Sequence, residues 1–293
     1  MTKPDYKFMH VILNQCLRLN AKKAIFAVFM YFLMQFFLMM IAVSFVSLDS
    51  FATMLIAFCL LVGVNICSEM LLYGLFVIMA RFVEKKYVTI GFLFIGFRKD
   101  QKRILKVALV FTLIYASITI LVSVAYFFCR NYFFIFFENT DSNSFFSFAA
   151  LIVVFLTMVF TIPFSFVRLI LYRNDEMQVL LAFKKSVSLI KGLFFHFVGF
   201  ILYACGKPLI QVIILQIVLL MFSASENSSA SMQFLMTFMG IASIMAQYRT
   251  LTRFFISITI YYYTRCGVLH PHKTESVSLS VSTENVLHDN KDE

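Results

Sequence analysis

The 293-residue chain has no tryptophan, and only 9 glycines and 4 prolines interrupt it. Charge is scarce as well: Asp, Glu, Lys and Arg make up 14% of the sequence, whereas hydrophobic residues make up 61%. A soluble globular domain carries much more charge and a smaller apolar fraction. The composition therefore excludes an ordinary soluble domain and predicts an integral membrane protein.

Sequence motifs of catalytic and metal sites are missing too. The six cysteines form no CxxC pair, and most lie within apolar runs, where a thiol behaves as a small hydrophobic group. The chain contains no HExxH, GxSxG, P-loop or GxGxxG motif, and its five histidines are scattered along the sequence and lack carboxylate partners in a recognisable motif. We therefore expect a protein that is not an enzyme and that has no cofactor, no catalytic residue and no metal site.

Long apolar runs are what the sequence does contain. A bilayer is crossed by ~20 helical residues, and the predicted spans are residues 24–48, 51–83, 104–128, 145–172, 193–222 and 232–264. The first run is too long for the apolar part of a signal peptide, so we expect it to remain as a span. The pattern predicts an all-α, polytopic membrane bundle of six transmembrane helices over residues 1–265, followed by a disordered polar cytoplasmic tail at 266–293.

Positive charge is distributed asymmetrically among the predicted loops. Of the 25 Lys and Arg residues, five lie in the N-terminal segment, eight in 81–106, five in 168–191 and five from Arg249 onward, which leaves Arg130 and Lys207. The four groups fall on one side of a six-span topology. The positive-inside rule then places both termini in the cytoplasm, and the net charge of +10 reflects orientation in the membrane and no binding of nucleic acid.

Residues 174–191 have the pattern of an ordinary amphipathic helix. Asn174 or Asp175 is predicted to be the N-cap, and Lys191 before Gly192 is predicted to end the helix. The predicted apolar face consists of Val179, Leu180, Phe183, Val187 and Ile190. The lysines of the other face are Lys184, Lys185 and Lys191. Such a helix lies along an anionic membrane surface or against the bundle that it connects.

Among the charged residues inside the apolar runs, three lie at a similar depth: Glu69, Lys207 and Arg249. Each is ~22–27 Å below the outer end of its run, at 1.5 Å per helical residue. We expect Glu69 to pair with Lys207 or Arg249, because a lone charge in hydrocarbon costs several kcal/mol. In one interpretation they form a cytoplasm-facing polar site for an ion, solute or lipid headgroup, where Gly206-Lys207-Pro208 kinks or breaks the helix. In the other, the three side chains reach the interface from helices that extend past the bilayer.

A further pattern joins Ile162-Pro163 in a span, Tyr172 at the cytoplasmic end of that span, and an amphipathic helix before the next span. The residues of that helix that carry the pattern are Ala182, Ser186, Leu189, Ile190, Lys191 and Gly192. In these features the chain resembles a bacterial family of uncharacterised integral membrane proteins, itself similar to the multi-pass membrane domain attached to some glycerophosphodiester phosphodiesterases. The resemblance implies a platform in the bacterial cytoplasmic (inner) membrane and transfers no activity.

Two functions therefore stay open. The first is a non-enzymatic scaffold or accessory protein whose basic cytoplasmic helices, 7–23, 87–106 and 175–191, contact anionic lipids or a membrane protein partner. The alternative is a transporter or lipid-handling protein that uses the intramembrane charges.

Overall fold

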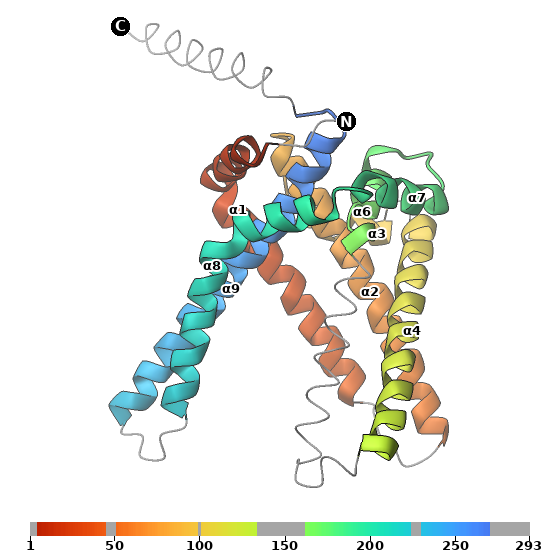
Figure 1. The fold of residues 1–293 in the computed structure, drawn as a ribbon, viewed down its shortest axis with the longest axis vertical. Coiled ribbons are helices and arrows are strands. Elements are labelled where there is room, and N and C mark those ends of the chain that lie inside the picture. The colour runs from red at the N-terminus through yellow and green to blue at the C-terminus, as the bar shows by residue number, and fades with distance from the viewer. Residues whose placement is uncertain (1–4, 45–50, 99–100, 134–161, 224–229, 270–293) are drawn as a thin grey trace, which may run out of the picture. The chain divides into compact units, whose positions relative to one another are not determined.

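The computed structural model describes residues 5–44, 51–98, 101–133, 162–223 and 230–269 (Figure 1). Within these ranges all regular structure is helical, so the predicted all-α class is confirmed. The elements are α1 (Tyr6–Ser44), α2 (Phe51–Val83), η1 (Ile90–Phe94), α3 (Ile95–Arg98), α4 (Gln101–Phe133), η2 (Ile162–Phe164), α6 (Val167–Arg173), α7 (Val179–Ile190), α8 (Phe194–Ser223) and α9 (Ala230–Arg265).

Three stretches of the described helices are long and apolar enough to cross a membrane, and they indicate a membrane protein. They are Tyr6–Ile41, Cys59–Val83 and Phe194–Val218. The first of them shows that the basic segment 7–23 and the span predicted from Ala24 belong to one helix, α1. The predicted spans 104–128 and 232–264 lie within α4 and α9.

The predicted fourth span, 145–172, lies largely outside the described residues. Its described end is interrupted, because η2 contains Pro163 and α6 begins only at Val167. A proline lacks the backbone N–H that a continuous helix needs at that position. Most of the predicted tail 266–293 also lies outside the described residues.

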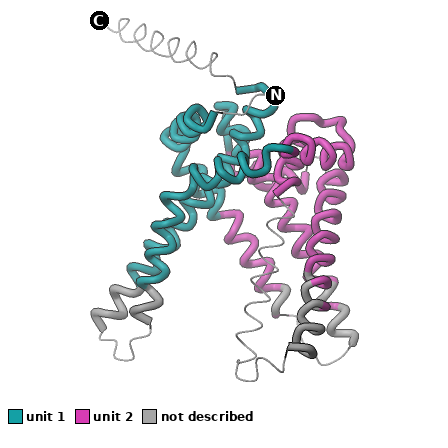
Figure 2. Tube along the Cα trace, viewed as in Figure 1, with its two compact units in different colours: residues 1–29, 79–88, 192–293 teal, residues 30–78, 89–191 magenta. Residues whose placement is uncertain are grey.

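The chain divides into two compact units, which are described separately (Figure 2). Unit 1 comprises residues 1–29, 79–88 and 192–293, and unit 2 comprises residues 30–78 and 89–191. Helices α1 and α2 each contribute to both units.

In unit 1, helices α8 and α9 run side by side in opposite directions (Figure 1). Tyr261, Tyr262 and Tyr263 on α9 are almost completely buried. The Tyr6 hydroxyl of α1 donates a 2.7 Å hydrogen bond to the backbone oxygen of His196, and the His196 ring lies 3.1 Å from the Tyr261 hydroxyl. These polar contacts join the first turns of α1 and α8 to the last turns of α9.

Helix α8 is continuous across Pro208 and changes direction along its length (Figure 1), so of the kink or break predicted at Gly206-Lys207-Pro208, the break does not occur. Proline cannot donate the usual helical hydrogen bond to the carbonyl four residues earlier, which here is that of Ala204. Arg253 Nη1 on α9 donates to this oxygen at 3.4 Å. The neighbouring helix thus supplies the donor that the proline removes.

In unit 2, the backbone of η1 and α3 lies directly against α2 without intervening side chains. A Cβ atom added to Gly74 on α2 would lie 2.0 Å from the backbone oxygen of Leu93, and one added to Gly96 would lie 2.6 Å from that of Met70. Leu93 is fully buried at this contact. Two glycines therefore hold the segment 89–98 on α2.

The connection before α7 corrects the predicted N-cap. Helix α7 begins at Val179, with Gln178 as the N-cap residue and no side-chain cap. Asn174 instead ends α6, where its side-chain amide donates to the Ile170 oxygen at 3.0 Å. Arg103 Nη2 on α4 donates to the backbone oxygens of Asn174 and Met177, each at 2.9 Å. The guanidinium satisfies both carbonyls and so holds residues 174–178 out of the helix.

The end of α7 agrees with the sequence, but part of its predicted face does not. The helix ends at Ile190, and Gly192 follows with a φ of 76°, a conformation that glycine adopts without strain. Leu180 and Val187, predicted on the inner face, are exposed. The buried side chains are Ala182, Phe183, Ser186, Leu189 and Ile190. The Ser186 hydroxyl donates to the Pro163 oxygen at 2.7 Å, and this polar contact sets the rotation of the helix.

Candidate functional site

A buried ion pair lies inside unit 2. The Glu69 side chain on α2 and the Arg168 side chain on α6 form a salt bridge, and both residues are 6% exposed. Arg168 Nη2 and Nε both donate to Glu69 Oε2, the latter at 3.2 Å. The predicted pairing of Glu69 with Lys207 or Arg249 is therefore wrong, since Arg168 is the partner of this carboxylate.

Aromatic and hydroxyl groups surround the pair. The Tyr115 hydroxyl on α4 lies 3.5 Å from Glu69 Oε1, so it is placed to donate to the second carboxylate oxygen. The guanidinium carbon of Arg168 lies 4.4 Å from the centre of the Phe111 ring and 5.7 Å from that of Phe76. Arginine is attracted to the face of an aromatic ring. The opposite charges of Glu69 and Arg168 offset each other. Their contacts with each other and with α4 link α2, α4 and α6.

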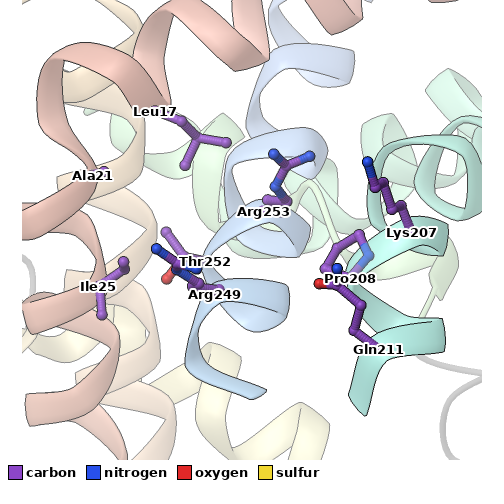
Figure 3. Close-up of a pocket in the computed structure, with 9 residues that line it drawn as sticks. All are labelled: Leu17, Ala21, Ile25, Lys207, Pro208, Gln211, Arg249, Thr252 and Arg253. Atoms are coloured by element: carbon purple, nitrogen blue, oxygen red, sulfur yellow. The ribbon is translucent and has the colours of Figure 1, made fainter. Parts of the chain in front are cut away.

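Lys207 and Arg249, the other two predicted intramembrane charges, line one cavity in unit 1. Its volume is about 400 Å³, and α1, α8 and α9 form its walls (Figure 3). The lining residues are Leu17, Ala21, Ile25, Lys207, Pro208, Gln211, Arg249, Thr252 and Arg253. On each helix these positions are three or four residues apart or adjacent, so they share one helical face.

The charge in this cavity is of one sign. Three of its lining residues, Lys207, Arg249 and Arg253, are basic and none is acidic. In the part of the chain that the structure describes, neither Lys207 nor Arg249 has a hydrogen-bond or ion-pair partner. Arg253 is held by its contact with the Ala204 oxygen. We refer to these three side chains as the basic pocket.

The lysines of the amphipathic helix lie on the exposed face of α7. Lys184, Lys185 and Lys191 are all exposed, as are the apolar side chains Leu180 (77%) and Leu181 (53%). Residues 179–190 contain no carboxylate. The face therefore combines positive charge with apolar side chains, as a helix at a lipid interface does.

Sequence reasoning missed two basic residues with defined roles. Arg168 enters the charge count only as one of the cytoplasmic residues, although an arginine between Phe166-Val167 and Leu169-Ile170 requires a buried partner. Arg253 follows Arg249 by four residues, so both could be expected on one face of a helix. Among the described residues, no group of three His, Cys, Asp or Glu side chains is placed to hold a metal ion.

The described helices, three of which contain stretches long and apolar enough to cross a membrane, indicate an all-helical membrane protein. No protein-family model, no curated protein and no solved structure matches it. The resemblance of residues 163–192 to a bacterial membrane protein family stays a prediction.

Proposed function

We propose that the chain is a non-enzymatic scaffold or accessory protein of the cytoplasmic membrane that works at the lipid surface through α7. The observation that carries the proposal is the exposed face of α7, where Leu180 and Leu181 are followed by Lys184 and Lys185, with Lys191 just after the helix. A basic amphipathic helix is attracted to anionic headgroups while its apolar side chains enter the interface. Arg103, and Ser186 through its bond to Pro163, hold α7 in place so that this face stays outward.

The proposal includes six spans with both termini in the cytoplasm. The asymmetry of Lys and Arg supports it. So do the lengths of α4 (33 residues) and α9 (36 residues), each long enough to cross a bilayer.

Single cysteines in a cysteine-free variant test this topology. With a membrane-impermeant maleimide on intact spheroplasts, Ser142→Cys and Ser228→Cys should be labelled, because both positions lie in predicted outer loops. Ser188→Cys and Ser276→Cys should be labelled only after the membrane is permeabilised. Equal labelling of all four positions in intact spheroplasts would disprove the six-span arrangement.

The absence of tryptophan makes the interfacial role of α7 directly measurable. In Leu181→Trp, the new indole is the only one in the protein. In proteoliposomes that contain phosphatidylglycerol, we expect blue-shifted emission and strong quenching by brominated lipid, because the lysines draw α7 to the surface by roughly 1 kcal/mol each. Adding Lys184→Gln, Lys185→Gln and Lys191→Gln should reverse both effects.

The matched control removes charge elsewhere in unit 2. Lys102→Gln with Lys106→Gln neutralises two exposed lysines at the start of α4 and should leave the emission of the introduced indole unchanged. Water-like emission in both anionic and zwitterionic vesicles would refute the role of α7. The basic pocket of unit 1 favours the alternative function, lipid handling.

A further inference from the structure

We propose that the basic pocket of unit 1 binds one phosphate group, and that an apolar wall beside it accommodates the hydrocarbon part of a phosphate-bearing amphiphile. This site is independent of α7, so its failure and the failure of the proposed accessory role are distinguishable. The shared chemistry is the phosphate, which is supplied either by a lipid headgroup or by free phosphate.

The charges of the basic pocket favour an anionic ligand. Arg249 and Arg253 are four residues apart on α9, and like charges at this spacing repel each other. Lys207 on α8 adds a third positive charge to the same cavity, and the lining holds no carboxylate to offset it. Exposed cations of this kind at a protein surface are stabilised by water, but beside apolar helices in a membrane an anion is the natural counter-charge.

The hydrogen-bond donors of the basic pocket suit a phosphate better than a carboxylate. Guanidinium groups present planar pairs of N–H donors that match the oxygens of a phosphate, and a lysine adds a mobile point charge. A carboxylate has two oxygens and one charge, which a single arginine satisfies. Three cations and the Gln211 amide in one cavity suit a group with more oxygens and up to two charges.

The wall of the pocket that α1 forms is apolar. Leu17, Ala21 and Ile25 recur every four residues along α1 and make that side of the pocket apolar. Beyond Pro208, α8 also exposes Ile210 and Ile214, three and seven residues after Lys207 and so on the same side of the helix. A cavity of about 400 Å³ lies within the range of small-ligand pockets. A headgroup phosphate can therefore meet the cations while acyl chains follow the apolar face of α8.

Pro208 accounts for the position of Arg253, one of the three cations. Because Pro208 leaves the Ala204 oxygen without its helical donor, Arg253 is held across α8 and α9 by that carbonyl. Arg253 is thus fixed before a ligand arrives, whereas Lys207 and Arg249 have no such partner among the described residues. Such preorganisation favours binding, since less side-chain freedom is lost.

Binding is tested with the full chain in a neutral detergent by native mass spectrometry and by thermal unfolding. The probes are inorganic phosphate and short-chain phosphatidic acid, each titrated separately. We expect one bound phosphate-bearing molecule per chain and a rise in the unfolding midpoint. Lys207→Gln and Arg249→Gln should each weaken binding by about tenfold, as expected for loss of a charge-assisted contact. These two side chains are exposed, so their replacement leaves the fold intact.

The control variant is Lys22→Gln with Lys23→Gln, which removes two exposed lysines of α1 near Ala21 that do not line the pocket. It should bind both probes as the unaltered protein does. Binding of phosphatidic acid alone identifies a lipid headgroup as the source, and binding of both probes identifies the phosphate itself as what is recognised. The proposal is overturned if neither probe binds, or if Lys207→Gln and Arg249→Gln bind as tightly as the control.

Discussion

Replacement of Arg168 by alanine is expected to destabilise the protein by about 3–5 kcal/mol, because it leaves the buried Glu69 carboxylate without its counter-charge. The substitution also removes the cation from the face of Phe111. The free energy cost should appear as a lower midpoint of thermal unfolding in neutral detergent, followed by circular dichroism. Lys22→Ala removes an exposed charge and should change the midpoint little.

A double substitution separates the cost of an unpaired charge from the cost of lost packing. Glu69→Leu with Arg168→Met removes both charges and keeps similar volumes. Replacing a buried ion pair by apolar residues is often neutral or stabilising, so this variant should regain most of the lost stability. A double variant as unstable as Arg168→Ala would show that the hydrogen bonds of the group, including that of Tyr115, account for the loss instead.

Substitution of Gly74 by alanine is expected to cost about 3 kcal/mol, at the upper end of the range for overpacked sites. The new Cβ would lie 2.0 Å from the oxygen and 2.5 Å from the carbonyl carbon of Leu93. Both atoms belong to the backbone, so no side chain can rotate away and the segment 89–98 must move off α2. The measurement is again the midpoint of thermal unfolding in detergent.

Gly63→Ala on the same helix is the matched control. Among the described residues, no atom beyond the adjacent residues and the local helix backbone lies within 4 Å of a Cβ at that position. Alanine stabilises a helix interior by roughly 0.5–1 kcal/mol relative to glycine, so this variant should melt at the same temperature or higher. If Gly74→Ala and Gly63→Ala gave equal midpoints, η1 and α3 would not be held on α2 as the structure shows.

The bounds of α2, α8 and α9 were predictable within two residues because they depend on local properties. The apolar run from Phe51 to Val83 coincides with α2, and Glu84 with its two following lysines ends it. Helix α8 begins and ends within one residue of the predicted run 193–222. Run length and charge at the ends decide such bounds, and in α8 Pro208 lies inside the run without ending the helix.

Contacts between distant residues were not predictable in the same way. Glu69 and Arg168 are 99 residues apart, and depth along an apolar run does not select one partner among several cations. Helix α7 begins at Val179 and not at the predicted Asn174, because Arg103, far away in the sequence, binds the carbonyls of Asn174 and Met177. The buried face of α7 differs from the predicted one because the Ser186 hydroxyl donates to the Pro163 oxygen.

The sequence by itself determined the all-helical membrane class, the bounds of α2, α8 and α9 and the presence of Lys207 and Arg249 inside apolar runs, because hydrophobicity and charge act locally along the chain. Only the tertiary structure decided which charges are neutralised. Glu69 is paired with Arg168 and closed off by aromatic rings, whereas Lys207 and Arg249 meet Arg253 in an acid-free pocket. The physical reason is that a buried charge is stabilised by whichever group the packing of helices brings within a few ångströms.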